Sequence, residues 1–367
     1  MKKVLTIFGC IIASLIIFSI LFLNLAPQFG SNPSSKQKRS YKTLSNYNNG
    51  EFKNREKLIM FTDEMPMASF FKKDSLKAPS RNIIPQNIDL IKFNNNNDKI
   101  KIAWLGHSSF IMNINGKILL LDPMLGKHAA PLPLPSLKRY NKELPFSISD
   151  LKSIDAVLLS HDHYDHLDYW TIKKIKNKVK TFYVPLGLGN HLREWGVKEE
   201  SIVELNWDQS RYIDDIELVC LTARHFSGRG PLNRNSTLWS SWAIKSKYGK
   251  IYFSGDSGYG DHFKKIGLEH GPFDLVMLDC GQYNKAWKYS HMFPQQSVKA
   301  AQDLNSKYFM PIHWGTFTLS THPWTDPPEK SIVFAKSVNQ KIINPMIGEV
   351  LIIDKLEESS NKWWELF

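Results

Sequence analysis

The sequence predicts an α+β protein in which two packed β-sheets are flanked by helices, preceded by an N-terminal transmembrane helix. Short apolar runs typical of strands come first in hairpins and later alternate with helical patterns, as expected for two sheets covered by helices. The chain has 367 residues, of which 42% are hydrophobic and 12% aromatic, so a sizeable core can form. Residues 4–25 are uncharged and consist mostly of Ile, Leu and Phe.

Residues 1–26 are expected to form a single-pass membrane anchor. The apolar stretch has the length of about 20 residues that a helix needs to cross a bilayer. It is longer than the roughly 7 to 15 apolar residues of a cleaved signal peptide, and no small-x-small cleavage site follows it. Lys2 and Lys3 before the stretch nearly balance the basic residues of positions 36–42 after it. The positive-inside rule therefore only slightly favours a domain outside the cytoplasm.

The charge of the chain bears on its partners. Its 47 Lys and Arg residues exceed its 35 Asp and Glu residues, which gives a formal net charge of +12. The excess is spread along the chain, which suits an anionic membrane surface or substrate, or simply a solvated lysine-rich surface. A stripe of alternating basic and aromatic residues, as in proteins that bind single strands, is absent, so no nucleic-acid partner is expected. Cys10, Cys220 and Cys280 form no disulfide framework.

Composition divides the rest of the chain. Residues 27–99 are expected to be a tether, rich in Ser, Asn and Lys, followed by an extension that packs on the main domain through residues such as Phe70, Phe71 and Ile83. Residues 100–355 form the main domain, and residues 356–367 a C-terminal tail.

Within the main domain, residues 101–114 and 117–121 are predicted to form a hairpin around Asn115 and Gly116. Further strands are predicted at 154–159, 181–184, 216–222, 239–246, 250–254, 274–279, 307–312 and 348–353. Helical patterns lie at 169–178, 260–267, 294–304 and 328–338.

The most informative segment is SHDHYDH at residues 160–166, directly after the apolar run at 156–159. In an extended or tightly turned segment, residues i and i+2 project to the same side, so His161 and His163 can share one metal ion. Asp165 and His166 lie one short turn further on and suit a neighbouring ion. A lone histidine is more often an ordinary core or surface residue, but this cluster at the end of a buried strand favours a site for two metals.

Three other strand ends can complete such a site. His225, Asp256 and His313 are each the first strong ligand after a predicted core strand. A dinuclear site needs more ligands than residues 160–166 offer, and these residues supply them.

This order of H-x-H-x-D-H, His, Asp and His resembles the metallo-β-lactamase superfamily. Surrounding segments resemble the branch that contains N-acylphosphatidylethanolamine-hydrolysing phospholipase D and its bacterial relatives: WLGHSSF at 104–110, LDPM at 121–124, SGDSGY at 254–259, GPFDL at 271–275 and IHWGTF at 312–317. The likeness covers roughly residues 27–340.

The resemblance implies a four-layer αβ/βα sandwich with two zinc ions at one edge of the sheets. It places His161, His163 and His225 on one ion, Asp165, His166 and His313 on the other, and Asp256 between them with a bridging hydroxide as nucleophile. The imidazole-rich ligand set would also accept iron, manganese or nickel.

Other residues have two interpretations each. Asp162 acts in proton transfer or supports the ligands, and Asp122 either orients a ligand or simply ends a strand. His107 and His291 resemble positions near the cleft and could polarise the substrate, or they bond to nearby backbone. Four aromatic residues form an apolar wall for acyl chains or belong to the core: Trp239, Trp242, Tyr283 and Trp287.

The function expected from these residues is a membrane-anchored dinuclear zinc hydrolase. The branch resemblance implies a phosphodiesterase of phospholipase D type, acting on a lipid such as an N-acylphosphatidylethanolamine. The alternative is a metal-dependent lactonase or carboxylic ester hydrolase acting on another small molecule, because the same centre serves both reactions. A non-enzymatic metal-binding protein would be expected to lack ligands, and all seven positions are filled. The oligomeric state is left open.

Overall fold

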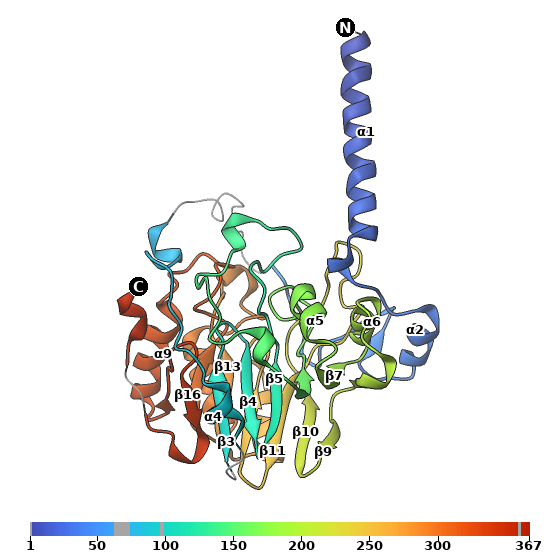
Figure 1. Ribbon diagram of the computed structural model, residues 1–367. Helices are drawn as coiled ribbons and strands as arrows, with labels where there is room; N and C mark the ends of the chain where they lie inside the picture. Colours follow the sequence, from blue (N-terminus) through green and yellow to red (C-terminus); the bar gives the residue numbers. More distant parts are fainter. Residues whose placement is uncertain (1, 62–73, 96–98, 359–360) are drawn as a thin grey trace.

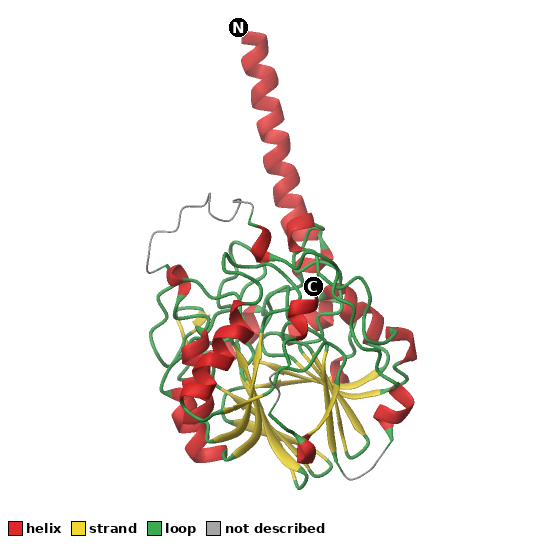
Figure 2. Cartoon of the chain, turned by 90° about the vertical axis from the view of Figure 1, so that its left-hand side faces the viewer, coloured by secondary structure: helices red, strands yellow, loops and turns green. Residues whose placement is uncertain are grey.

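The computed structural model describes residues 2–61, 74–95, 99–358 and 361–367. Phe70 and Phe71 therefore lie outside the described residues. Two seven-stranded sheets pack face to face, with helices on their outer faces (Figures 1 and 2). This arrangement confirms the predicted fold class.

The first sheet has the strand order β16-β3-β4-β5-β6-β7-β8. Its strands β16, β3, β4 and β5 are antiparallel, and β5 to β8 are parallel. Asn115 and Gly116 both have positive φ, 50° and 85°, which suits the tight turn predicted between β4 and β5. The strands are β3 (Ile100–Trp104), β4 (Phe110–Ile114), β5 (Lys117–Leu121), β6 (Ile154–Leu158), β7 (Val179–Pro185), β8 (Ile202–Leu205) and β16 (Val350–Ile352).

The second sheet has the order β15-β14-β13-β12-β11-β10-β9. Strands β9 to β12 are antiparallel, and β12 to β15 are parallel. Sequence analysis missed β9 because its residues are largely exposed and carry no apolar run. The strands are β9 (Gln209–Ile213), β10 (Ile216–Leu221), β11 (Ser241–Ser246), β12 (Gly249–Phe253), β13 (Phe273–Asp279), β14 (Ser306–Ile312) and β15 (Lys341–Ile342).

Helices cover the outer face of each sheet. On the first sheet, α4 (Leu90–Asn94), α5 (Tyr169–Ile175) and α6 (Gly189–Glu194) contribute to one outer core cluster. On the second, α7 (His262–His270), α8 (Pro294–Asp303) and α9 (Asp326–Ser337) contribute to another. Helices α5, α7, α8 and α9 correspond to the four predicted helical patterns. The resulting order of layers is helix, sheet, sheet, helix.

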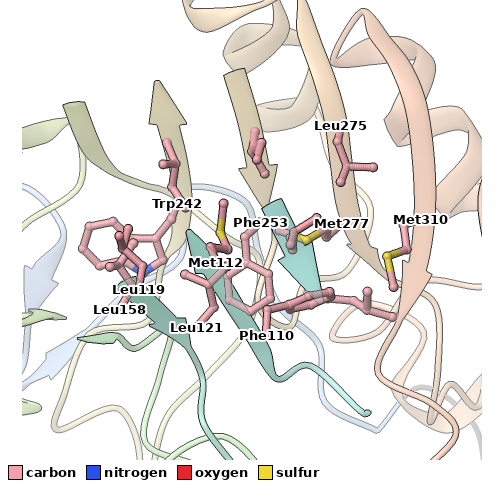
Figure 3. Close-up of a cluster of buried hydrophobic side chains, with 14 of the residues drawn as sticks. Phe110, Met112, Leu119, Leu121, Leu158, Trp242, Phe253, Leu275, Met277 and Met310 are labelled. Carbon is pink, nitrogen blue, oxygen red and sulfur yellow. The ribbon is translucent and has the colours of Figure 1, made fainter. Parts of the chain in front are cut away.

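The largest core cluster lies between the two sheets, as Figure 3 shows. Alternate residues of each strand face it: Phe110 and Met112 of β4 point into this cluster, whereas Ile111 between them faces the helices. Phe253 and Met277 meet them from the second sheet. Each such side chain contributes about 1.5–3 kcal/mol on burial, so this layer holds the sheets together.

Helix α1 (Lys2–Leu25) stands clear of the domain (Figure 1). Its window Thr6–Leu23 has a mean hydropathy of 2.7, and, among the residues described, none of the window is buried. By length and composition, this helix could cross a membrane as an anchor or serve as a signal sequence.

The segment after α1 is not the free tether that its polar composition predicted. It forms η1 (Pro27–Phe29), α2 (Ser35–Tyr41), β1 (Tyr47–Asn48) and β2 (Glu51–Phe52). Tyr41, Tyr47 and Phe52 are buried in the core between the sheets. Three large aromatic side chains bury enough apolar surface to fix an otherwise polar segment.

The C-terminal residues also differ from the predicted tail. Trp363 and Trp364, in η8 (Trp363–Leu366), are 2% and 1% exposed and pack against Trp314. Their large apolar area explains why the end of the chain closes over the core instead of extending into solvent.

Candidate metal centre

The seven predicted metal ligands meet at one end of the two sheets. His161 follows β6, His225 follows β10, Asp256 follows β12, and His313 follows β14. Strands β6, β12 and β14 lie in the parallel parts of their sheets, and β10 runs in the same direction as β12, so the residues that follow these strands gather at one edge. Together with His107, which was not predicted as a ligand, the predicted ligands form two groups whose candidate ligand atoms lie within 4.8 Å of one another: His161, His163, His225 and Asp256, and His107, Asp165, His166 and His313.

The first group has the spacing of a tetrahedral site. His163 Nδ1 lies 2.9 Å from His161 Nε2 and 3.3 Å from His225 Nε2. Asp256 Oδ2 lies 3.7 Å from the Nε2 atoms of both His161 and His225. Four ligands at zinc–nitrogen distances of about 2.0–2.1 Å would be separated by roughly 3.4 Å, so the group suits one ion.

Asp256, a member of the first group, also lies close to the second. Its Oδ1 atom lies 3.1 Å from His166 Nε2 and 3.1 Å from His313 Nδ1. Asp165 Oδ2 lies 3.5 Å from His166 Nε2 and 3.9 Å from His313 Nε2. Because the two carboxylate oxygens of Asp256 face different groups, this side chain can bridge two ions.

Two buried atoms indicate that the ligands fit a metal. Within the part of the chain that the structure describes, neither His166 Nε2 nor Asp256 Oδ1 has a hydrogen-bond partner. Leaving buried polar atoms unpaired is costly unless another group satisfies them. A divalent ion between imidazole nitrogens and carboxylate oxygens would satisfy both atoms, and the donor set is typical of zinc.

Hydrogen bonds turn three of the imidazoles toward the centre. His225 Nδ1 donates to Ser290 O at 2.9 Å, and His161 Nδ1 lies 2.9 Å from Ser160 Oγ. His166 Nδ1 lies 2.7 Å from Asp122 Oδ2. Each bond leaves Nε2 free for a metal, as in the ligand-orienting contacts of known metal sites.

Asp122 has the geometry of a residue that orients ligands. Its carboxylate is fully buried and accepts from the backbone N–H of Ser160 at 2.7 Å, from the Ser160 hydroxyl, and from His166. Burial raises the pKa of Asp122, while the bonds from His166 and Ser160 act in the opposite direction. Its φ of 36° is rare for a residue other than glycine. These contacts favour the orienting role over a simple end of a strand.

His107 joins the two sheets at the centre. Its N–H donates to Trp314 O at 3.1 Å, and its carbonyl accepts from His313 N at 3.0 Å. Both His107 and His313 have positive φ, 55° and 69°, a strained conformation that is common at functional sites. His107 Nε2 lies 2.8 Å from Asp165 Oδ2, so its ring contacts a candidate ligand directly.

His291 lies at the rim of the centre, where its side chain is 14% exposed. Its ring stacks on His313 with centroids 5.1 Å apart, and its Nδ1 lies 2.9 Å from Asp279 Oδ2. Burial raises the pKa of Asp279 to about 7 against the attraction of His291. Burial lowers the pKa of His291, but Asp279 outweighs it and raises the value. Sequence analysis missed Asp279. This residue is the last of β13, and four of the predicted ligands likewise come shortly after the ends of strands.

Asp162 lies outside both groups. Its carboxylate accepts from Gly228 N at 2.7 Å and from Thr237 Oγ1 at 2.8 Å, and it lies 3.3 Å from His191 Nε2. Burial acts to raise the pKa of Asp162, but the bonds from His191 and Gly228 hold it well below its usual value. Because three donors already bond to this carboxylate, the structure favours a supporting role for Asp162 over proton transfer. His191, a partner missed by sequence analysis, lies in α6, far away in the sequence.

Burial and neighbouring charge set the protonation of the ligands. Burial lowers the pKa of His161 and His225 well below the ordinary value, so both rings are neutral at pH 7, as metal binding requires. Burial acts to raise the pKa of Asp165 and Asp256, but the surrounding imidazoles hold both well below the usual range. His166 differs: burial acts to lower its pKa, but the carboxylates of Asp256 and Asp165 and the bond to Asp122 raise the value well above the ordinary one, so a metal ion would have to displace its proton.

The four aromatic residues do not form one continuous wall, because two of them lie in the core. Trp239 and Trp242 are buried in the core between the sheets. Tyr283 stacks on His322 with centroids 4.2 Å apart, and Trp287 Nε1 donates to Gln282 O at 2.8 Å. The core interpretation therefore holds for Trp239 and Trp242, whereas Trp287 is only half-buried.

Comparisons with known proteins agree with this geometry. A family model described as the beta-lactamase superfamily domain matches residues 118–314. An uncharacterised protein of Mycobacterium tuberculosis is 38% identical over 313 residues, which cover 83% of this chain and 83% of that protein. N-acyl-phosphatidylethanolamine-hydrolyzing phospholipase D 1 of Caenorhabditis elegans is 35% identical over 242 residues, which cover 62% of this chain and 67% of the worm protein.

A solved structure shares the fold. Igni18, a metallo hydrolase of the archaeon Ignicoccus hospitalis, matches with a TM-score of 0.52 and 19% identity, covering 69% of this chain and 98% of its own. At this identity, the match shows a common fold.

Proposed function

Since the chain belongs to the metallo-β-lactamase superfamily of metal-dependent hydrolases, we propose that it is a membrane-anchored dinuclear zinc phosphodiesterase acting on a phospholipid. The substrate class that we propose is an N-acylphosphatidylethanolamine or a closely similar lipid, cleaved as by a phospholipase D.

We assign the ligands as the two groups suggest. His161, His163 and His225 would hold one ion, and Asp165, His166 and His313 the other. Asp256 would bridge them, because its two oxygens face different groups. When bound, such a pair of ions supplies Lewis acidity and lowers the pKa of coordinated water toward neutrality.

One observation supports a lipid substrate: the turn at the end of the apolar helix α1 lies against the loop that holds candidate metal ligands. Phe29, in the turn after α1, packs edge-on against Tyr164 with ring centroids 6.2 Å apart. Tyr164 lies between His163 and Asp165, two of the candidate ligands. If α1 crosses a membrane, the centre lies close to the bilayer, where a phospholipid is available.

Similarity to the worm phospholipase D supports the same substrate class. That protein is named for the hydrolysis of N-acyl-phosphatidylethanolamine, and its 35% identity extends over 242 residues. The fold alone would not distinguish a phosphodiester from an ester, because the same centre can activate water against either.

Residues at the rim would handle the proton of the leaving group. The His291 ring lies against His313 and is partly exposed, and Asp279 holds its Nδ1. An imidazole oriented by a buried carboxylate is a common arrangement for proton transfer. His107 contacts Asp165 and would hold that ligand in place.

The test uses the full chain, purified in lipid nanodiscs and loaded with zinc. It is assayed in parallel on an N-acylphosphatidylethanolamine, on phosphatidylcholine and on a lactone of similar chain length. We expect release of phosphatidic acid from the first lipid, loss of this activity with a chelator, and its return with zinc. His270→Ala, which changes a histidine of α7 outside both groups, is the matched control for His163→Ala.

If the lactone is cleaved and neither lipid phosphodiester is, the protein is a lactonase and the proposed phosphodiesterase activity is wrong. Activity that survives complete metal removal would contradict the proposed centre. Recovery of the chain in the soluble fraction without α1 would show that this helix is a signal sequence.

A further inference from the structure

Three segments of the domain converge on the short turn that follows α1. Gln28 Nε2 donates to Pro131 O at 2.9 Å, which holds the loop around residues 131–134. Arg229 Nε donates to Gln28 O at 3.0 Å, which holds the loop around residues 228–232. Trp195 Nε1 donates to Pro27 O at 2.6 Å. Pro27 and Gln28 are therefore bonded to parts of the chain far apart in sequence.

Two of these segments carry exposed apolar side chains, and another such side chain lies beside the third. Leu132 and Leu134 are 44% and 45% exposed, and Leu232 is 97% exposed. Trp170 is 64% exposed and contacts Tyr169, which packs on Trp195. An isolated exposed apolar residue is normal, but several around one point mark an interaction site.

The turn itself is rigid. Ser31 N donates to His191 Nδ1 at 3.0 Å, and Gly30 has a φ of 67°. A Cβ atom at Gly30 would lie 2.2 Å from His191 Nδ1, so only glycine fits this close approach. The domain is thus held in one orientation at the foot of α1 instead of swinging on a flexible linker.

The direction of α1 identifies what the apolar residues meet. The helix leaves the domain at the end where the loops gather (Figures 1 and 2). A bilayer crossed by α1 would begin where its apolar surface ends, next to the loops bonded to Pro27 and Gln28. Lys127 and Lys138, which flank the loop around residues 131–134, are exposed and would suit anionic headgroups.

We propose that Leu132, Leu134, Trp170 and Leu232 form a bilayer-contact surface around the foot of α1. This surface enters the headgroup and upper acyl region and seats the metal centre against the membrane, as apolar side chains at an interface do. The inference rests on the proposed membrane anchor. The partner of the bilayer-contact surface is the lipid bilayer itself, because this surface continues the apolar face of α1.

A fluorescent probe can report the depth of this surface. The full chain carries Cys10→Ser, which leaves Cys220 and Cys280, both buried. A single cysteine is then introduced as Leu132→Cys or Leu232→Cys and labelled with the environment-sensitive dye NBD. Leu268→Cys is the matched control, because Leu268 is 79% exposed near the C-terminal end of α7, at the sheet end opposite the centre.

In nanodiscs of phosphatidylcholine and phosphatidylglycerol, we expect blue-shifted NBD emission at positions 132 and 232 and quenching by lipids with spin labels near the headgroup. The probe at position 268 should show neither effect. Water-like emission at both loop positions, in chains that remain inserted in the nanodiscs, would overturn the proposal. Chains that do not insert at all would instead refute the anchor.

A kinetic comparison provides a second readout. Leu132→Asp combined with Leu232→Asp should raise KM for substrate embedded in the nanodisc by at least about tenfold. Burial of one leucine side chain in the bilayer changes a binding constant by roughly that factor. kcat and the hydrolysis of a soluble short-chain substrate should be unchanged. Leu268→Asp should alter neither. An unchanged KM for embedded substrate would contradict the proposal.

Discussion

His166 Nε2 lies 3.1 Å from Asp256 Oδ1, and neither buried atom has a hydrogen-bond partner within the described residues. The two residues come from different sheets, one after β6 and the other after β12. The meeting of the sheets therefore creates a pair of unsatisfied atoms that a divalent cation would join.

The metal content should depend on Asp256 more than on any other ligand. The full chain should contain about two zinc ions, as expected for a dinuclear hydrolase. Asp256→Ala should lose both ions, because its oxygens face both groups, whereas His163→Ala should lose one. Elemental analysis after gel filtration measures the content, and His270→Ala should match the unmodified chain. Two ions retained by Asp256→Ala would refute the bridging role.

Asp122→Asn should weaken metal binding without removing a ligand. An amide has one acceptor oxygen for the bonds from His166 and Ser160, and its NH₂ group would face a donor. Loss of such an orienting contact typically lowers metal affinity about 10- to 100-fold. Competition with a chromogenic chelator measures the affinity. The exposed Asp150→Asn serves as a control, and equal affinities for both variants would show that Asp122 only ends a strand.

Asp279→Asn should impair turnover while the metals stay bound. The carboxylate that holds His291 Nδ1 would be lost, and a general acid–base contribution is worth about 10²–10⁴ in rate. We expect kcat to fall by at least about 100-fold with KM little changed. Asp303→Asn, at the end of α8, is the control. A normal kcat would exclude proton transfer by His291 with Asp279 as its partner.

Asp162→Asn should destabilise the fold more than it slows the chemistry. The amide NH₂ would replace one of the two carboxylate oxygens, so it would face either the donor Gly228 N or the pair Thr237 Oγ1 and His191 Nε2. An unpaired buried group costs about 1–3 kcal/mol, so the free energy of unfolding should fall by that amount. Urea denaturation followed by tryptophan fluorescence measures this loss.

Thr237→Val removes one of the same hydrogen bonds and should have a smaller effect of the same sign. If Asp162→Asn kept full stability but lost its turnover at saturating zinc, Asp162 would instead act in proton transfer.

Most elements of the fold could be predicted because their signals are local. Strand β6 contains most of the apolar run at residues 156–159, and the turn at Asn115 and Gly116 needs only positive φ at two adjacent residues. Strand β9 was missed because its exposed residues have no apolar pattern. The packing of Tyr41 and Trp363 was missed because both lie in short polar segments. The sequence of such a segment does not show whether its aromatic residues pack into the core.

The residues that could bind metal can be identified from the sequence alone. His161, His163, Asp165 and His166 adjoin one another in the chain, and His225, Asp256 and His313 each follow a core strand, so strand direction alone brings them to one edge. The contacts that support the centre, by contrast, are visible only in the folded chain. The pairs His291–Asp279 and Asp162–His191, and the attachment of Gln28 to Arg229, join segments that are far apart in the chain. Such contacts depend on how the two sheets and the helices pack, and no local pattern of residues encodes that packing.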